Sequence, residues 1–357
     1  MKRFTIALLV AIVGTVGHHQ ALAQNMNSYT AYPPFINKSV PPAVMLMMTK
    51  DHRLFFKGYN DIVDLDNGKP GGDAAIDTTY KDNIDYVGYF DSKKCYAYSS
   101  PADNSFASAG RFNPTANGTG TYGHVCSASA AWWSGNFLNW STMARIDIIR
   151  KVLYGGKRIV DSIGAETSLG VVGGNYGTTV LGRTITPRDA HSWAKVYQAA
   201  DVASFVPAAF TSGNAITICN TNSAAAETVG FMMVLAGSFP DADSTEATQC
   251  NPAAANPVFA AADVKATYRV AVRVCWATFG LEADCDTYYD DISAAPNNFY
   301  TYKPQGLLQR MAVNSNGSTG TSDDTITMRF GLISGSYDKN FSGGVLRSKV
   351  TDLYGQE

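Results

Sequence analysis

The stretch WWSGNFLNWSTMARIDIIRKVLYGG, residues 132–156, decides most of what this sequence says about its fold. When residues from Leu138 onward are projected at about 100° per position, five apolar side chains fall on one stripe. These side chains are Leu138, Ile146, Ile149, Val152 and Leu153. The charged residues Asp147, Arg150 and Lys151 fall outside this stripe. The pattern predicts one amphipathic helix over residues 138–153 that turns its apolar side to a core.

Both ends of this helix carry suitable residues. Ser134 can cap the amino-terminal end, and Gly155 with Gly156 can end the helix in a left-handed turn. Three tryptophans, Trp132, Trp133 and Trp140, lie off the apolar stripe. They could form a ligand platform, but tryptophans near a helix start more often seal the edge of a domain, which we expect here.

Residues 1–23 have the features of a secretory signal peptide. Lys2 and Arg3 precede a mainly apolar run over 4–16, and Ala21-Leu22-Ala23 has the form that a signal peptidase cleaves. The mature chain then begins near Gln24, and no later stretch is long enough for a transmembrane helix. We therefore expect an exported protein of the periplasm, cell surface or pilus. Of 28 basic residues, 26 remain against 30 acidic ones, a balance that does not predict nucleic-acid binding.

Six cysteines remain after cleavage, and an even number in an exported chain favours disulfides. They are Cys95, Cys126, Cys219, Cys250, Cys275 and Cys285. Six cysteines allow fifteen connectivities, among which we favour the pairing of sequence neighbours. A metal site is the competing interpretation, but the sequence has no C-x-x-C motif and few histidines.

Three segments have the patterns of strands. Ala43–Met48 and residues 328–334 are short apolar runs, typical of strands covered on both faces, and residues 268–275 alternate as a half-solvated strand does. Long insertions with little periodicity separate them, at about 58–126 and 156–325. Strands that alternate with a helix favour an α/β sheet. We expect Ala43–Met48 and residues 328–334 to be neighbouring strands, with the 138–153 helix across them. We expect the rest of the sheet to be missing.

Four long pieces of the sequence resemble the amino-terminal region of the PilY family, the large secreted factors of type IV pili. They are FFKGYNDIVDLD (55–66), DTTYKDNIDYVGYFDSKKCYAY (77–98), WSGNFLNWSTMARIDIIRKVLYGGKR (133–158) and MRFGLISGSYDKNFSGGVLR (328–347). The resemblance implies an export signal, a von Willebrand factor A-like α/β domain with insertions over 24–357, and a carboxy-terminal β-propeller. No propeller pattern occurs before Glu357. The chain is therefore expected to be a fragment, a truncated reading frame or a short relative.

Two acidic stretches are candidate cation sites. A-type domains often bind a divalent cation through D-x-S-x-S, but Arg53 and Phe55 replace the two serines after Asp51, so we predict no cation there and a loop or capping role for Asp51. The family resemblance also implies a calcium-like loop in which Asp64, Asp66 and Asp77 would be ligands. Residues 69–73 lengthen this loop. A solvated acidic turn is the alternative.

Aromatic residues are frequent in the first insertion. They are Tyr80, Tyr86, Tyr89, Phe90, Tyr96 and Tyr98. They could form an adhesive surface, but tyrosines also pack irregular loops while keeping their hydroxyls hydrogen-bonded, and we favour packing.

The sequence contains no G-x-S-x-G, H-E-x-x-H or phosphate-binding glycine motif, so we do not expect an enzyme. The resemblance implies a type IV pilus assembly and retraction factor and surface adhesin. Such a protein would act by contact with minor pilins or other pilus components, or with a host or surface ligand. The alternative is a secreted A-type binding module unrelated to pili.

Overall fold

The computed structural model describes the chain in several stretches, all of which belong to one compact unit, Ala43–Glu357, apart from Pro42. These stretches are 42–49, 51–59, 79–99, 110–161, 178–185, 192–221, 229–240, 250, 258–289, 300–314, 325–326, 328–335 and 344–351. The predicted signal peptide, residues 1–23, lies outside them. Among the described helices, none has the length and apolar character needed to cross a membrane.

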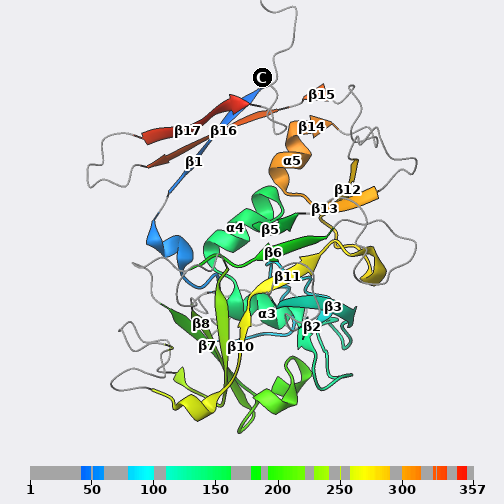
Figure 1. Cartoon of the computed structure of the whole chain (residues 1–357), viewed down its shortest axis with the longest axis vertical. Helices are drawn as coiled ribbons and strands as arrows, with labels where there is room; N and C mark the ends of the chain where they lie inside the picture. The colour runs from blue at the N-terminus through cyan, green and yellow to red at the C-terminus, as the bar shows by residue number, and fades with distance from the viewer. Residues whose placement is uncertain are drawn as a thin grey trace, which may run out of the picture. The chain divides into compact units, whose positions relative to one another are not determined.

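The two apolar runs that we predicted to be neighbours do pair. Strand β1 (Ala43–Met48) lies parallel to β16 (Arg329–Gly335), and β16 pairs antiparallel with β17 (Gly344–Thr351) (Figure 1). The expectation that β1 is covered on both faces is wrong. It is an edge strand of this sheet, and Met47 is 83% exposed.

The predicted helix over 138–153 is two helices, α3 (Gly135–Thr142) and α4 (Arg145–Tyr154) (Figure 1). The chain between them is extended because residues 56–58 pair with it. Gly58 donates from its amide to the Met143 carbonyl (2.8 Å), and Arg145 donates to Phe56 (3.1 Å). These backbone bonds replace the helical bonds that local propensity favours.

The predicted ends of the helix are correct. Ser134 caps α3, accepting from the Phe137 amide, and Gly155 ends α4 in the left-handed conformation with φ 84°. The break, however, changes which side chains of α4 face the core. Asp147 is fully buried and Val152 is 44% exposed, which is opposite to the prediction for these two residues, whereas Leu138 and Ile146 are buried as predicted. Helix α3 packs on β2 (Lys94–Ser99), β4 (Trp133–Ser134) and β8 (Ala215–Thr221). Helix α4 packs on η1 (His52–Phe55) and α5 (Leu307–Ala312). Neither helix therefore has the expected position across β1 and β16.

The two insertions contain ordered sheets and are not the loop-rich segments that we expected. One sheet has six strands in the order β4-β2-β3-β11-β6-β5. The bounds are β2 (Lys94–Ser99), β3 (Arg111–Asn117), β4 (Trp133–Ser134), β5 (Arg158–Asp161), β6 (Thr179–Gly182) and β11 (Ala271–Val274). Only β3 and β11 pair in parallel, so the sheet is mixed.

A second sheet has four antiparallel strands in the order β10-β9-β8-β7. The bounds are β7 (Trp193–Gln198), β8 (Ala215–Thr221), β9 (Phe231–Ala236) and β10 (Val264–Arg269). The strand predicted over 268–275 is split at Val270 between this sheet and β11 of the six-stranded sheet. All four residues of β11 are buried, so the expectation of a half-solvated strand is wrong there. Val270 is buried and donates to the Gly230 carbonyl at this crossing point.

The remaining elements are short. They are β12 (Cys285–Tyr289), β13 (Tyr300–Pro304), β14 (Val313–Asn314), β15 (Thr325–Ile326), η4 (Val202–Ser204), η5 (Ala208–Phe210), η7 (Ala261–Asp263) and η8 (Ala277–Phe279). The hairpin β12-β13 is antiparallel and follows directly from the last disulfide.

The core is aromatic. Trp133 and Trp140 are each 1% exposed and pack with residues of both insertions, so they do not seal a domain edge, whereas Trp132 is partly exposed. Five of the six aromatic residues singled out in the first insertion are buried, Tyr98 being the partly exposed one. Tyr80, for example, contacts the rings of Phe137, Trp140 and Phe205. These aromatics therefore pack loops and strands onto α3, as favoured, and do not form an adhesive surface.

Candidate functional site

The structure places the predicted site residues in three different situations. All six cysteines form disulfides, Cys95–Cys126, Cys219–Cys250 and Cys275–Cys285, which are the neighbouring pairs that we favoured. Asp51 caps η1 by accepting from the Arg53 amide at 2.9 Å, which is the capping role expected of it. The calcium-loop candidates Asp64, Asp66 and Asp77 lie outside the described residues.

Two buried asparagines on α3 hold the segment 80–91 against the helix. Asn139 accepts from the Phe90 amide (3.0 Å) and donates to the carbonyls of Tyr86 and Phe90 (2.8 Å each). Asn136 accepts from the Tyr86 amide (2.8 Å) and donates to the Ile84 carbonyl (2.8 Å). A neutral amide can serve donors and acceptors at once without burying a charge. The pair therefore fixes a segment that has no regular secondary structure of its own.

His124 ties the same segment to the loop that precedes Cys126. Its side chain is fully buried, with Nδ1 2.7 Å from the Asp82 carbonyl and Nε2 2.7 Å from Asp85 Oδ1. Lys93 also contacts Asp85 Oδ1, at 2.6 Å. Burial raises the pKa of Asp85, but hydrogen bonds from Lys93 and His124 outweigh it, so the pKa lies below its ordinary value. Both ring nitrogens are engaged by protein oxygens, which makes His124 a structural residue.

Asp147 and Arg183 form a buried electrostatic cluster between α4 and the sheets. Asp147 Oδ1 accepts from the Tyr89 hydroxyl and the Thr184 amide, each at 3.0 Å. Arg183 donates from Nη2 to the carbonyls of Thr221 (2.9 Å) and Phe231 (2.8 Å). Burial raises the pKa of Asp147 and lowers that of Arg183 to about 10, and the opposite charges partly offset both shifts. The cluster joins the six-stranded sheet to β8 and β9.

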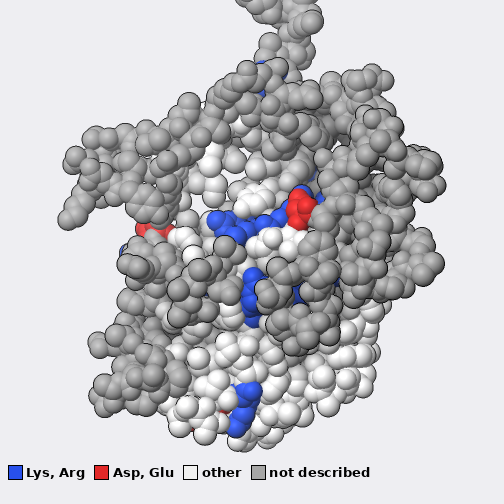
Figure 2. Space-filling view, in the orientation of Figure 1, with Lys and Arg blue, Asp and Glu red and all other residues white. Residues whose placement is uncertain are grey.

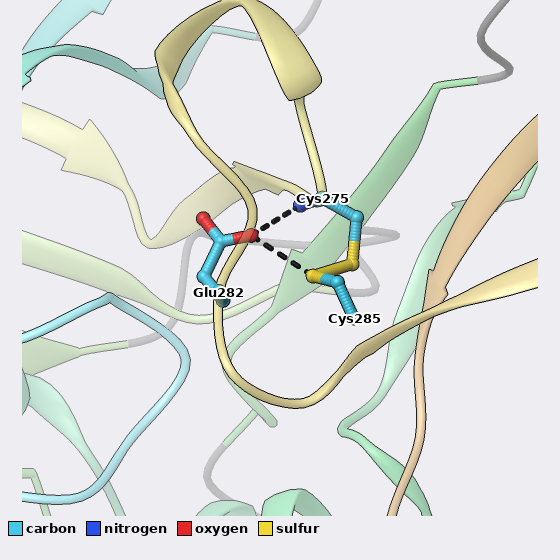
Figure 3. A group of neighbouring side chains, drawn as sticks. All are labelled: Cys275, Glu282 and Cys285. Carbon is cyan, nitrogen blue, oxygen red and sulfur yellow. Dashed lines mark hydrogen bonds between the residues drawn. A yellow bond between two sulfur atoms is a disulfide. The ribbon is translucent and has the colours of Figure 1, made fainter.

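The most distinctive chemistry in the described chain lies at the Cys275–Cys285 loop, residues 275–285 (Figure 3). Glu282, 7% exposed, points into the loop, where its Oε2 accepts from the Cys275 amide (2.7 Å) and lies 3.0 Å from Cys285 Sγ. Its other oxygen, Oε1, accepts from Lys94 Nζ (2.8 Å), which also donates to the Gly280 carbonyl (2.6 Å). A buried ion pair thus fastens the loop to strand β2.

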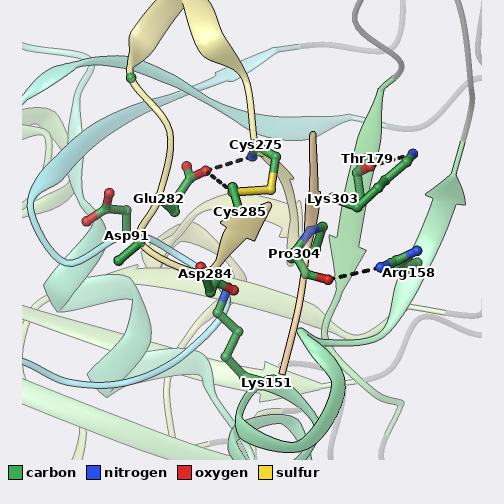
Figure 4. The surroundings of a disulfide bond; sticks show 12 residues. Asp91, Lys151, Arg158, Thr179, Cys275, Glu282, Asp284, Cys285, Lys303 and Pro304 are labelled. Atoms are coloured by element: carbon green, nitrogen blue, oxygen red, sulfur yellow. Dashed lines mark hydrogen bonds and ion pairs between the residues drawn. A yellow bond between two sulfur atoms is a disulfide. The ribbon is translucent and has the colours of Figure 1, made fainter. Parts of the chain in front are cut away.

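Further polar contacts hold the carboxy-terminal side of this loop (Figure 4). Asp284 pairs with Lys151 of α4 at 2.6 Å. Beyond it, Lys303 of β13 donates to Thr179 (2.9 Å), and Arg158 donates to the Pro304 carbonyl (2.9 Å). The loop is therefore bound to α4 and, through the β12-β13 hairpin, to β5 and β6.

Cys275, Glu282 and Cys285 also form the one group of potential metal ligands among the described residues. Both sulfurs are shared in the disulfide, however, and a cysteine ligates a metal as its thiolate. The oxidised loop therefore offers a metal little more than one carboxylate, which Lys94 already neutralises.

The surface of the loop is uncharged over residues 276–281. Leu281 is 39% exposed, and Trp276 and Phe279 are partly exposed. The Arg273 guanidinium stacks on the Trp276 ring at 3.7 Å, which fixes that ring. Figure 2 shows small separate groups of charged side chains among uncharged residues on one face of the described surface. A rigid loop with exposed apolar groups is suited to contact with another protein.

The fold and this loop define a disulfide-stabilised, mixed α/β protein. Its sequence matches the family description "PilY1 homolog, small alpha/beta domain" over residues 77–233 and "PilY1 homolog, second domain" over 330–357. The chain therefore belongs to the PilY1 family of type IV pilus biogenesis factors.

Two curated relatives, both called type IV pilus biogenesis factor PilY1 homolog, come from Xylella fastidiosa strain Temecula1. One is 31% identical over 333 residues, which cover 87% of this chain, and the other is 28% identical over 295 residues, which cover 77%. The chain spans 19% of the length of each relative. Comparison with solved structures gave no significant match.

Six of these buried polar residues were not predicted from the sequence: Asn136, Asn139, Asp147, Arg183, Lys94 and Glu282. A signal existed for the asparagines, because two amides three positions apart among aromatic residues are unusual on a core helix. No signal in the sequence joins Lys94 to Glu282, since these partners are 188 positions apart.

Proposed function

We propose that this protein acts in type IV pilus assembly and retraction and as a surface adhesin, by protein–protein contact and without catalysis. The partners would be minor pilins or other pilus components, and a host or surface ligand for adhesion. The observation that carries the proposal is the similarity to one PilY1 homolog over 87% of the chain and to a second over 77%. The three disulfides support an exported location, in the periplasm, at the cell surface or on the pilus.

Deletion of the gene tests this role. We expect fewer surface pili, smaller twitching zones and weaker attachment, each restored by the wild-type gene on a plasmid. Pili should be counted by electron microscopy and by pilin recovered after shearing. Normal piliation, twitching and attachment in a deletion strain without a paralogue would contradict the proposal.

We place the contact at the Cys275–Cys285 loop and expect Leu281→Asp to weaken it. A charge at a desolvated contact costs about 2 kcal/mol or more, which would lower partner binding at least tenfold. Val152→Asp is the matched control, because Val152 is an exposed apolar residue of α4 with a similar exposed fraction, 44% against 39%. With both variants exported equally, Leu281→Asp should fail to restore twitching and Val152→Asp should restore it. Equal restoration of twitching by both variants would show that the loop is not the site of this contact.

We also propose that β1 and β16 are neighbouring strands of a von Willebrand factor A-like sheet. The support is their parallel pairing across a long insertion, with α5 packed on β16. A crystal structure of a full-length relative tests this proposal. Further parallel strands beside this pair are expected, and an antiparallel β-sandwich there would contradict it.

A calcium ion bound by Asp64, Asp66 and Asp77 is a further part of the proposed function, supported by the alternating carboxylates. We expect calorimetric titration with CaCl₂ to show one site that Asp64→Ala removes. If Asp64→Ala gave the same binding heat as the wild type, any calcium would be bound by other residues.

A further inference from the structure

The six cysteines differ in exposure. Five of them are at most 4% exposed, whereas Cys285 is partly exposed. Thiol–disulfide exchange requires an external sulfur to reach one sulfur of the pair. An external thiol or disulfide can therefore reach the Cys275–Cys285 disulfide more easily than the other two. The sulfur that it can reach is that of Cys285.

Glu282 is positioned to move the proton that this exchange requires. Its Oε2 lies 3.0 Å from Cys285 Sγ, yet a disulfide sulfur carries no proton. The contact becomes a hydrogen bond when Cys285 is a thiol, which can donate S–H to the carboxylate. The Cys275 amide and Lys94 each bind one carboxylate oxygen and hold the Glu282 side chain in this position.

The other two disulfides have different polar neighbours. Cys95 Sγ lies 3.8 Å from the Val125 carbonyl, and Cys250 Sγ lies 3.9 Å from the Trp193 carbonyl. A backbone carbonyl can accept a hydrogen bond but cannot take the proton at ordinary pH. These two disulfides thus provide an internal comparison within the same molecule.

We propose that Cys275–Cys285 is a thiol–disulfide exchange site of the folded protein, at which Glu282 accepts the proton of Cys285. Its substrates are external disulfides and dithiols. In the oxidation direction, the Cys285 thiolate attacks an external disulfide R–S–S–R, a bond to Cys285 forms, and one R–S⁻ leaves. The Cys275 sulfur then attacks Cys285 Sγ, and the second R–S⁻ leaves. The two leaving thiolates take up the two cysteine protons, one of them through Glu282, and a dithiol reverses the sequence.

Brief reduction of the folded protein with dithiothreitol, followed by reoxidation with oxidised glutathione, tests the proposal. Alkylation and peptide mass analysis follow each cysteine separately. We expect Cys275–Cys285 to open first. At pH 6 its closure should be slowed at least about tenfold by Glu282→Gln, since general-base assistance contributes that much or more. Asp284→Asn is the matched control, because Asp284 lies in the same loop but pairs with Lys151 of α4. The disulfide of this variant should close at the wild-type rate.

The pH profile separates proton transfer from a general effect on structure. At pH 9 an ordinary thiol ionises without help, so Glu282→Gln and wild type should close at equal rates. If Glu282→Gln fails to fold, the pH dependence of closure in the wild-type protein still tests the proposal. Closure of Cys275–Cys285 should then change less than about threefold between pH 6 and pH 8, whereas an unassisted thiol accelerates about tenfold per pH unit below its pKa. Opening no earlier than the other disulfides, equal closure of Glu282→Gln at pH 6, or an unassisted wild-type profile would each overturn the proposal.

Discussion

Asn139→Asp is expected to lower the free energy of unfolding by at least about 3 kcal/mol, although the side chain keeps its shape. The Asn139 amide nitrogen donates to the carbonyls of Tyr86 and Phe90. In aspartate, a carboxylate oxygen would replace this nitrogen and face both carbonyl oxygens in a buried site. The segment 80–91 would lose its attachment to α3, and with it the packing of Tyr80 and Tyr86. Urea denaturation followed by tryptophan fluorescence measures this loss, because Trp140 lies one residue further along the helix.

Asn117→Asp is the matched control for this isosteric change. Asn117 ends β3 and is exposed, so its substitution should change stability by less than about 0.5 kcal/mol. If Asn139→Asp were as stable as Asn117→Asp, the three hydrogen bonds of Asn139 would not be what holds segment 80–91.

Arg183→Met is expected to cost about 3–5 kcal/mol, because it removes the donor of two carbonyls and the positive charge that acts on a buried carboxylate. Two carbonyls, on Thr221 and Phe231, would lose their donor, and the Asp147 carboxylate would remain buried without its nearby cation. Methionine fills a similar volume, so the loss reports on charge and hydrogen bonding more than on packing.

The same variant should change how stability depends on pH. Burial raises the pKa of Asp147 above its ordinary 3.8, and the charge of Arg183 acts against this rise, so Arg183→Met should raise the pKa further. A carboxyl whose folded-state pKa exceeds its unfolded-state value stabilises the fold when protonated, and this stability is lost as pH rises through the folded-state pKa. As pH rises above the ordinary Asp pKa of 3.8, the variant should therefore lose more stability than the wild type.

The double variant Arg183→Met/Asp147→Asn tests whether the buried Asp147 charge causes the instability of Arg183→Met. Asparagine can still accept from Tyr89 and Thr184 through its oxygen, and it carries no charge to desolvate. We expect it to regain part of the lost stability and to remove the added pH dependence. A double variant that is as unstable and as pH-dependent as Arg183→Met would show that Asp147 is not the group responsible.

Features that depend on neighbouring residues were predictable from the sequence. The apolar runs at Ala43–Met48 and 328–334 are strands, Ser134 caps a helix, and Gly155 ends one. In each case the signal lies within a few residues, in side-chain branching, a hydroxyl cap or the conformational freedom of glycine. The neighbour pairing of the cysteines was favoured but not determined, because any of fifteen connectivities fits six cysteines.

Features that depend on distant partners were not predictable. The helix breaks at Met143 because Gly58 and Phe56 bond to its backbone from more than eighty positions away. This break turns α4, so that Asp147 faces inward and Val152 outward. Val270 likewise lies between two strands, where its amide donates a hydrogen bond to the carbonyl of Gly230, forty positions earlier. Helical periodicity and strand alternation describe only local residues and cannot predict such contacts. At these positions the distant contacts outweigh local propensity.

The parallel pairing of β1 with β16 has a consequence for the order in which the protein folds. About 280 residues separate the two strands, and closing a loop of that length costs about 5 kcal/mol of chain entropy. Strand β1 is synthesised long before its partner, so AVMLMM remains an unpaired apolar segment until residues 329–335 have followed. A chaperone that binds short apolar segments of unfolded chains would therefore bind at Ala43–Met48 before β16 is available.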